Sequence, residues 1–282
     1  MVRQLRPFPG MNRHKRWLLH LYYYGSLPYR RCAGWWRVVR SAAPVMILFY
    51  HRVADSVPND WTMTNRQFVR QIDWLRQRFD LVSLAEAQRR IRSDGTKRPS
   101  VSITFDDGYQ SVANATEVLS EFGFPATIFA TVGWIDRSSS GSNYWNQWPS
   151  LTWAELRACM NQGMEIGAHS VSHPCLPTCS DSELAYELND AKVLLEQQLG
   201  SEITSLSYPH GLYDDRVKRF VSAAGFRLGC TSVCGVNRHS FGSLELHRTE
   251  ISGADDMAIF RRKLAGQYDW MGLWQRWQAR KS

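Results

Sequence analysis

Apolar residues along this chain form short compact runs that alternate with segments in which they recur every three or four positions. A short run rich in β-branched or aromatic residues is typical of a buried strand, and the wider spacing is typical of a helix packed on a core. We expect strands at residues 45–50, 101–105, 126–131, 165–169, 203–208, 226–231 and 244–251. We expect helices at residues 66–79, 83–91, 110–122, 152–161, 180–199 and 214–224. This alternation predicts an α/β fold in which a parallel sheet, open or closed into a barrel, has helices outside it.

Three of these helices begin with a recognisable capping residue. Thr152 with Glu155, and Ser180 with Glu183, have the spacing of a capping box, in which the two side chains bond to each other's backbone N–H groups. Ser83 is a cap of the simpler kind for the helix at 83–91.

The positive charge of the chain is concentrated at its two ends. The net charge is +8, and residues 1–43 are basic and aromatic without a single acidic residue. Residues 266–282 form a basic amphipathic tail whose apolar face carries Trp270, Leu273, Trp274 and Trp277. Such segments suit peripheral contact with a membrane, although the tail could equally pack on the barrel or on a partner subunit. No nucleic-acid-binding module is recognisable, so we expect no nucleic-acid partner, and the oligomeric state stays open.

Cysteine usage and the N-terminal sequence indicate the compartment. Six cysteines in 282 residues do not make the disulfide framework of a small secreted domain, and we expect reduced thiols. The apolar run Trp17 to Tyr24 is too short for a signal peptide core or a membrane span, and Arg30 and Arg31 follow it instead of a cleavage site. We therefore expect a cytoplasmic protein, with peripheral membrane association left open.

Reactive side chains fall where the expected strands end. Asp106 and Asp107 follow one strand, His169 ends another, and Pro209 with His210 follow a third. In parallel barrels the active site is built at the carboxyl ends of the strands. Gly108 permits a turn there, so the two aspartates can serve one site in different roles, although Asp-Asp-Gly is also typical of an inert solvated turn.

His169 and His173 are spaced so that both imidazoles could bind one metal ion. A carboxylate from Asp107 would complete a His-His-Asp set with an open position for water, as in catalytic sites. Zinc suits these ligands best, and cobalt, nickel, iron and manganese are alternatives. The competing interpretation is one structural and one surface histidine.

Two strings carry a resemblance to a known family. TFDDG (Thr104–Gly108) and HSVSHP (His169–Pro174), in this order and at this separation, resemble the first two motifs of the polysaccharide deacetylase family, also called the NodB-homology domain or carbohydrate esterase family four. YPHG (Tyr208–Gly211) is similar to its third motif. The start at Phe49 to Arg52 and a tryptophan-rich loop resemble the branch that acts on exopolysaccharides.

The resemblance implies a fold and a set of roles. The fold would be a distorted (β/α) barrel with seven strands, over a catalytic domain at residues 44–265 between the N-terminal extension (1–43) and the C-terminal tail (266–282). Asp107, His169 and His173 would hold a divalent metal, and Asp106 would be the general base that activates metal-bound water. The backbone amide of His210, next to Pro209, would stabilise the oxyanion.

This sequence departs from the family pattern at two positions. Ser207 stands where the third motif usually has an arginine that orients the base, and His210 stands where it usually has a tyrosine. We hypothesise that Arg248, on the last strand, supports Asp106 instead. A guanidinium far from the Asp106 carboxylate would refute this hypothesis.

Other candidate residues are less constrained. His247 matches the histidine that the family's last motif uses as general acid, but it is adjacent to Arg248, so both reach the centre only if the strand bends or ends there. His51 could contact sugar, support the base or be a packed structural histidine. Trp145 is our first candidate for stacking on a pyranose ring, and the other aromatic residues at 134–153 could either stack on sugar as well or cover the barrel mouth or core.

The sequence therefore favours a metal-dependent hydrolase that removes N-acetyl groups from an N-acetylhexosamine-containing exopolysaccharide or its lipid-linked precursor. Two alternatives remain: an amidohydrolase acting on another amide, such as a formyl group or a cyclic imide, and an inactive carbohydrate-binding barrel.

Overall fold

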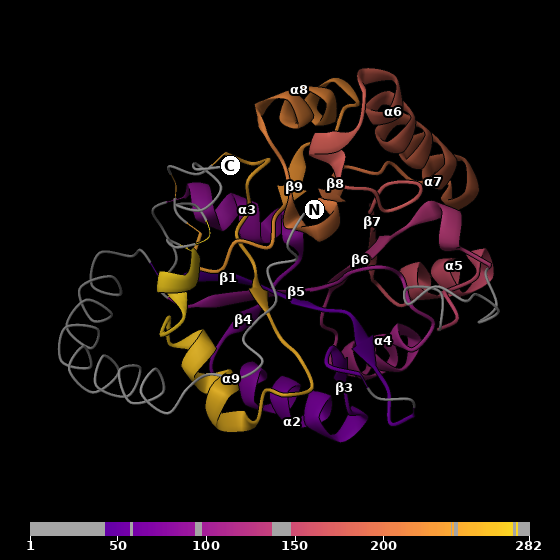
Figure 1. Ribbon diagram of the computed structural model, residues 1–282. Coiled ribbons are helices and arrows are strands. Elements are labelled where there is room, and N and C mark those ends of the chain that lie inside the picture. The colour runs from indigo at the N-terminus through magenta and orange to yellow at the C-terminus, as the bar shows by residue number, and fades with distance from the viewer. Residues whose placement is uncertain are drawn as a thin grey trace.

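The computed structural model describes residues 43–56, 59–93, 98–136, 148–237, 239, 242–272 and 275. Strands gather at the centre of the molecule, and helices surround them on the outside (Figure 1). The two longest strands of the sheet, β1 (Val45–Tyr50) and β5 (Ser100–Phe105), are neighbours and are buried at every position. Complete burial explains why β1 is a continuous apolar run, since both faces of a parallel strand are covered.

Seven strands form one parallel path in the order β10-β1-β5-β6-β7-β8-β9. The other strands of this path are β6 (Ala126–Ala130), β7 (Glu165–Ala168), β8 (Ser205–Ser207), β9 (Leu228–Cys230) and β10 (Thr249–Glu250). Beside the path, β4 (Asp80–Leu81) pairs with β5, while β2 (Arg52–Val53) and β3 (Thr62–Met63) form a separate pair.

The segment 246–251 brings the two ends of the path together. The Leu246 N–H donates to the Gly229 carbonyl of β9 at 2.8 Å, and the Ile251 N–H donates to the Phe49 carbonyl of β1 at 2.9 Å. One segment thus contacts the last strand and the first. The sheet curls into a distorted (β/α) barrel, and the predicted fold class is confirmed.

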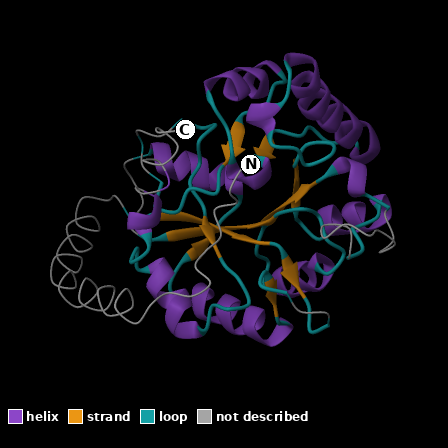
Figure 2. Cartoon of the chain, in the orientation of Figure 1, coloured by secondary structure: helices purple, strands orange, loops and turns teal. Residues whose placement is uncertain are grey.

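The helices lie outside the sheet (Figure 2). They are α2 (Asn65–Arg76), α3 (Leu84–Arg92), α4 (Val112–Glu121), α5 (Trp153–Asn161), α6 (Asp181–Ala185), α7 (Ala191–Leu199), α8 (Asp215–Ala223) and α9 (Met257–Leu264). Both predicted capping boxes are present, and the Ser83 side chain accepts from the Glu86 N–H. Short helical turns add η1 (Val132–Trp134), η3 (Leu176–Thr178) and η5 (Pro209–Gly211).

Two predicted elements differ from the structure. The helix expected at 180–199 contains a π-helical turn, η4 (Tyr186–Asp190), between α6 and α7. The strand expected at 244–251 is reduced to β10, because its first half bridges to Cys230 and its second half pairs with β1. One regular strand cannot satisfy both partners.

The terminal segments are described only in part. The N-terminal extension up to residue 42 lies outside the described residues. In the C-terminal tail, Gln275 accepts from the Cys234 N–H at 2.9 Å and donates to the Ser232 carbonyl at 3.3 Å. This part of the tail therefore packs on the barrel, which is one of the alternatives that the sequence left open. No helix in the described part of the chain is long and apolar enough to cross a membrane. All five cysteines outside residues 1–42 are unpaired thiols, as expected.

Candidate active site

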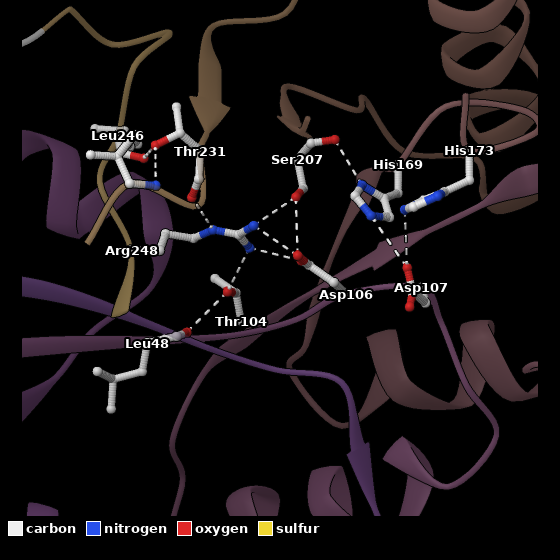
Figure 3. Close-up of polar contacts among 11 residues, drawn as sticks. Leu48, Thr104, Asp106, Asp107, His169, His173, Ser207, Thr231, Leu246 and Arg248 are labelled. Atoms are coloured by element: carbon white, nitrogen blue, oxygen red, sulfur yellow. Dashed lines mark hydrogen bonds and ion pairs between the residues drawn. The ribbon is translucent and has the colours of Figure 1, made fainter. Parts of the chain in front are cut away.

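The predicted reactive residues meet at one edge of the barrel. Asp106 and Asp107 directly follow β5, His169 directly follows β7, and Ser207 ends β8. Arg248 immediately precedes β10. Because neighbouring strands are parallel, these side chains come to the same edge of the sheet, where Figure 3 shows them in contact.

The backbone separates the two adjacent aspartates. Asp107 has φ 71° and Gly108 has φ 69°, so the chain leaves the strand through two consecutive left-handed residues. Asp106 consequently points toward Arg248, whereas Asp107 points toward the two histidines (Figure 3). Both carboxylates are buried, which excludes the solvated-turn interpretation.

Asp107, His169 and His173 form one compact cluster. The Asp107 Oδ1 atom lies 3.3 Å from His169 Nε2 and 3.5 Å from His173 Nε2. One ligand atom from each of the three residues lies within 4.8 Å of the others. This arrangement excludes the interpretation in which one of the two histidines lies apart on the surface.

The His169 ring has a fixed orientation that suits a metal ligand. Its Nδ1 lies 2.8 Å from the Ser207 carbonyl oxygen, which can only accept, so Nδ1 carries a proton. The Nε2 lone pair then faces the Asp107 oxygen, which is also an acceptor. Two acceptors in this arrangement call for a positive charge between them, either a proton or a metal ion. A carboxylate and two imidazoles are suitable ligands for a divalent metal of the zinc type.

The pKa values of the cluster reflect the same electrostatics. Burial would raise the pKa of Asp107, but the hydrogen bond with His169 and the charge of His173 hold it well below its usual range. Burial would lower the pKa of His169, yet the hydrogen bond to Asp107 and the charge of Asp106 raise it above its ordinary value. Burial and the neighbouring His169 lower the pKa of His173 to about 3. His173 is therefore neutral at physiological pH and able to act as a ligand.

Asp106 and Arg248 form a bidentate ion pair. Arg248 Nη1 lies 2.7 Å from Asp106 Oδ1, and Nη2 lies 2.7 Å from Oδ2. The contact that we hypothesised between these two residues is present. Burial alone would raise the pKa of Asp106, but the charges of Arg248 and His169 outweigh it and hold the pKa below its ordinary value.

Every remaining donor of the Arg248 guanidinium group also has an acceptor nearby. Its Nη2 donates to Ser207 Oγ at 2.8 Å, Nη1 to Thr104 Oγ1 at 3.1 Å, and Nε to the Thr231 carbonyl at 2.9 Å. The guanidinium carbon also lies 4.4 Å from the centre of the Phe49 ring. A fully buried cation needs this degree of satisfaction to remain charged.

Residues 93–229 match the family model described as polysaccharide deacetylase. This part of the chain belongs to the polysaccharide deacetylase family. The match includes both aspartates, both histidines and Ser207, and it ends before Arg248.

Curated relatives support the assignment. The chain is 27% identical over 222 residues to YxkH of Bacillus subtilis, which is assigned to the polysaccharide deacetylases, and the alignment covers 77% of this chain and 75% of that protein. It is 27% identical over 140 residues to a chitooligosaccharide deacetylase of Sinorhizobium fredii (49% and 59% covered). It is 23% identical over 181 residues to a poly-beta-1,6-N-acetyl-D-glucosamine N-deacetylase of Staphylococcus aureus (60% and 61% covered). The chain thus spans less than two thirds of the last two relatives.

Solved deacetylase structures share the fold. The Streptococcus pyogenes deacetylase PplD superposes with a TM-score of 0.69 at 23% identity, covering 78% of this chain and 98% of that one. IcaB from Ammonifex degensii gives a TM-score of 0.68 at 22% identity, covering 80% and 97%.

Ser207 and His210 are the two departures from the deacetylase motifs. Ser207 stands at the position of the arginine in the motif, and its hydroxyl group accepts from Arg248. Arg248 in turn makes the contact with Asp106 that the motif arginine would make. His210 has φ 58°, and its ring centre lies 4.5 Å from that of His173. Pro209 precedes it in η5, at the same edge of the barrel.

The two histidines proposed to contact substrate or move protons differ in their surroundings. His51 is half-buried, and its charge lowers the pKa of Asp106 and of Asp107, after larger effects from other groups. His247 is buried, and its backbone N–H donates to the Asn237 side chain at 2.8 Å while its carbonyl accepts from the same amide. Since Arg248 is the neighbour that reaches Asp106, the acid role of His247 stays a prediction.

The structure describes only some of the aromatic residues expected to contact sugar. Trp145 falls in residues 137–147, outside the described residues. Trp134, in contrast, is buried with its ring centre 5.4 Å from that of His173.

Sequence reasoning missed Thr104, which bonds to both Arg248 and the Leu48 carbonyl. Its position two residues before Asp106 on β5 was the available signal, because alternate residues of a strand share a face.

Proposed function

We propose that this deacetylase-family protein is a metal-dependent hydrolase that removes N-acetyl groups from an N-acetylhexosamine-containing polysaccharide or its lipid-linked precursor. The proposal rests on the different partners of two adjacent aspartates. Asp106 forms an ion pair with Arg248, whereas Asp107 contacts His169 and His173. Hydrolysis of an amide by water needs both a proton acceptor and an electrophilic centre. The names of the relatives from Sinorhizobium fredii and Staphylococcus aureus support a polymer of N-acetylglucosamine as the substrate.

Asp107, His169 and His173 would hold the divalent metal, for which zinc is our first choice and cobalt, nickel, iron and manganese are alternatives. When bound, such an ion polarises the amide carbonyl and makes water more acidic. Asp106 would take up the proton of the attacking water. Arg248 keeps Asp106 ionised and correctly oriented for this transfer, because it binds both carboxylate oxygens.

The amine leaving group needs a proton, and two histidines are candidates to donate it. His51 is the stronger candidate because it acts electrostatically on both aspartates and its buried Nδ1 has no hydrogen-bond partner among the described residues. His247 remains the alternative that the sequence motif suggests. The N–H of His210 would donate to the carbonyl oxygen as negative charge develops there.

The test is acetate release from β-1,4- and β-1,6-linked N-acetylglucosamine oligomers, measured before chelation, after chelation, and after zinc or cobalt is added back. We expect release that requires the metal and is lost in Asp106→Asn. Stoichiometric metal binding without acetate release would indicate another amide substrate. Sugar binding without metal or acetate release would favour an inactive carbohydrate-binding barrel.

A further inference from the structure

A buried carboxylate from outside the catalytic edge contacts the loop that carries His173. Glu187 Oε2 accepts from the Val171 N–H and from the Ser172 N–H, each at 2.8 Å. Its Oε1 accepts from the Ser172 hydroxyl group at 2.5 Å. The Glu187 side chain is buried, and it has no part in the chemistry proposed for the site.

The loop that Glu187 contacts has an unusual backbone. Ser170 has φ 64° and His173 has φ 63°, both in the left-handed region that non-glycine residues rarely adopt. Ser170 lies between the two candidate histidine ligands, and His173 is one of them. A strained conformation of this kind persists only when surrounding contacts determine it.

Two elements fix the loop from opposite sides of its backbone. From η1, the Val132 N–H donates to the Ser170 carbonyl at 3.1 Å and the Gly133 N–H donates to the Val171 carbonyl at 2.8 Å. From η4, the Glu187 carboxylate accepts hydrogen bonds from the Val171 and Ser172 N–H groups. The Ser170 and Val171 carbonyl groups therefore bond to η1, and the Val171 and Ser172 N–H groups bond to Glu187, while the His173 N–H donates to the Ser170 hydroxyl oxygen at 2.9 Å.

Glu187 comes from the one π-helical turn among the described helices. It lies in the π-helical turn η4, which interrupts the run from α6 to α7. Such turns carry an extra residue per hydrogen-bonded ring and occur often at functional sites. The flanking residues Leu184 and Leu188 are fully buried, so the helix holds Glu187 rigidly against the loop.

We propose that Glu187 is a positioning residue for the metal centre, whose hydrogen bonds to the Val171 and Ser172 amides hold His173 in its ligand conformation. The inference rests on the metal centre of the proposed function. Charge-assisted bonds from a carboxylate to N–H groups are strong, and residues that orient metal ligands typically contribute about 10–100-fold to metal affinity.

Three variants separate the reach, the charge and the acceptors of Glu187. Glu187→Ala removes all three bonds. Glu187→Asp keeps the charge but is one methylene shorter, so it cannot reach both amides from the same helix. Glu187→Gln keeps an oxygen for both amides, and its NH₂ group can donate to the Ser172 hydroxyl oxygen.

The closing experiment measures cobalt binding to the full chain by competition with a chromophoric chelator, together with the visible spectrum of the bound cobalt. We expect Glu187→Ala and Glu187→Asp to weaken cobalt binding by about 10–100-fold and to alter the spectrum. We expect Glu187→Gln to bind within a few-fold of the parent protein. Amide exchange of Val171 and Ser172 in the metal-free protein should rise in the first two variants only.

Glu183→Ala is the matched control. Glu183 lies in α6, four residues earlier, and likewise accepts a backbone N–H and a serine hydroxyl group, both from Ser180. It does not touch the ligand loop, so we expect unchanged cobalt affinity and spectrum.

The outcomes distinguish the inference from the proposed function. Cobalt affinity and spectrum unchanged in Glu187→Ala, beside a parent protein that binds one cobalt ion, would overturn the role of Glu187 alone. Should Glu187→Ala fail to fold, Glu187→Asp decides the question in the same way. A parent protein that binds no cobalt would overturn the metal centre itself, and the inference with it.

Discussion

Asp106 and Asp107 are neighbours in sequence and almost equally buried, with 4% and 3% of their surfaces exposed, but they lie in opposite halves of the site. The Asp106 half is an arginine network that includes Thr104 and Ser207, and the Asp107 half is a pair of histidines. Burial cannot be what distinguishes the two carboxylates. Their partners do, and the left-handed backbone at Asp107 is what directs them to different partners.

The largest effect should come from removing the charge in each half separately. Asp106→Asn should reduce acetate release by about 10²–10⁴-fold, the usual contribution of a general base, while metal content stays unchanged. Asp107→Asn should abolish activity together with stoichiometric metal, because it removes a ligand. Metal analysis beside kinetics on both variants checks this, and equal metal loss in both would mean that the two halves are not separate.

The second prediction breaks the arginine network. Arg248→Met leaves Asp106 buried without its cation, and this should lower the free energy of unfolding by about 3–5 kcal/mol. Combining it with Asp106→Leu should restore much of that stability, because both charges are then gone. Urea denaturation of the single and double variants measures the coupling; a double variant no more stable than Arg248→Met would contradict it.

The same network sets a pH dependence with a definite sign. The pKa of Asp106 is held below its ordinary 3.8, so the network contributes stability above that pH, which is lost as the pH falls through the lowered pKa. In Arg248→Met the pKa of Asp106 should rise, because its main cation is absent. The acid limb of the pH–rate profile should therefore move to higher pH, whereas the limb of a variant that damages only the fold would stay in place.

The comparison also separates what the sequence could predict from what it could not. Barrel topology and the Asp107 half follow from local patterns, because apolar runs mark strands and both histidines lie within one short string. The Asp106 half joins Thr104, Ser207 and Arg248, which are distant in sequence, and of the two departures from the family motifs only Ser207 pointed to it. The π-helical turn at Glu187 has no signal in the apolar pattern, since Leu184, Leu188 and Leu195 keep ordinary helical spacing.

The fourth prediction concerns the proton donor. His51→Ala should lower acetate release by about 10²-fold, the lower end of the range for general acid catalysis, without loss of metal. His247→Ala should affect thermal stability more than catalysis, because it removes a buried side chain. A larger catalytic loss in His247→Ala than in His51→Ala would return the acid role to the residue that the family motif indicates.

The smallest effect should come from the residue that touches both halves. Ser207 bonds to Asp106 and Arg248 through its hydroxyl group, at 3.3 Å and 2.8 Å, and to His169 Nδ1 through its backbone carbonyl. Ser207→Ala removes only the bonds of the hydroxyl group to Asp106 and Arg248 and keeps the bond of the carbonyl to His169. We expect a loss of about 1.5–3 kcal/mol in stability, typical of hydrogen bonds to charged groups, with a small rise in the pKa of Asp106.

Metal affinity is the measurement that makes this last variant informative. Because the Ser207 carbonyl is still present in Ser207→Ala, the orientation of His169 and the affinity for cobalt should not change. Weakened cobalt binding would mean that the arginine network supports the metal ligands through Ser207, and the two halves would then act as one unit. Unchanged binding with a shifted acid limb would establish that the hydroxyl group serves Asp106 alone, and that a serine with a distant arginine can replace the motif arginine without disturbing the histidines beside it.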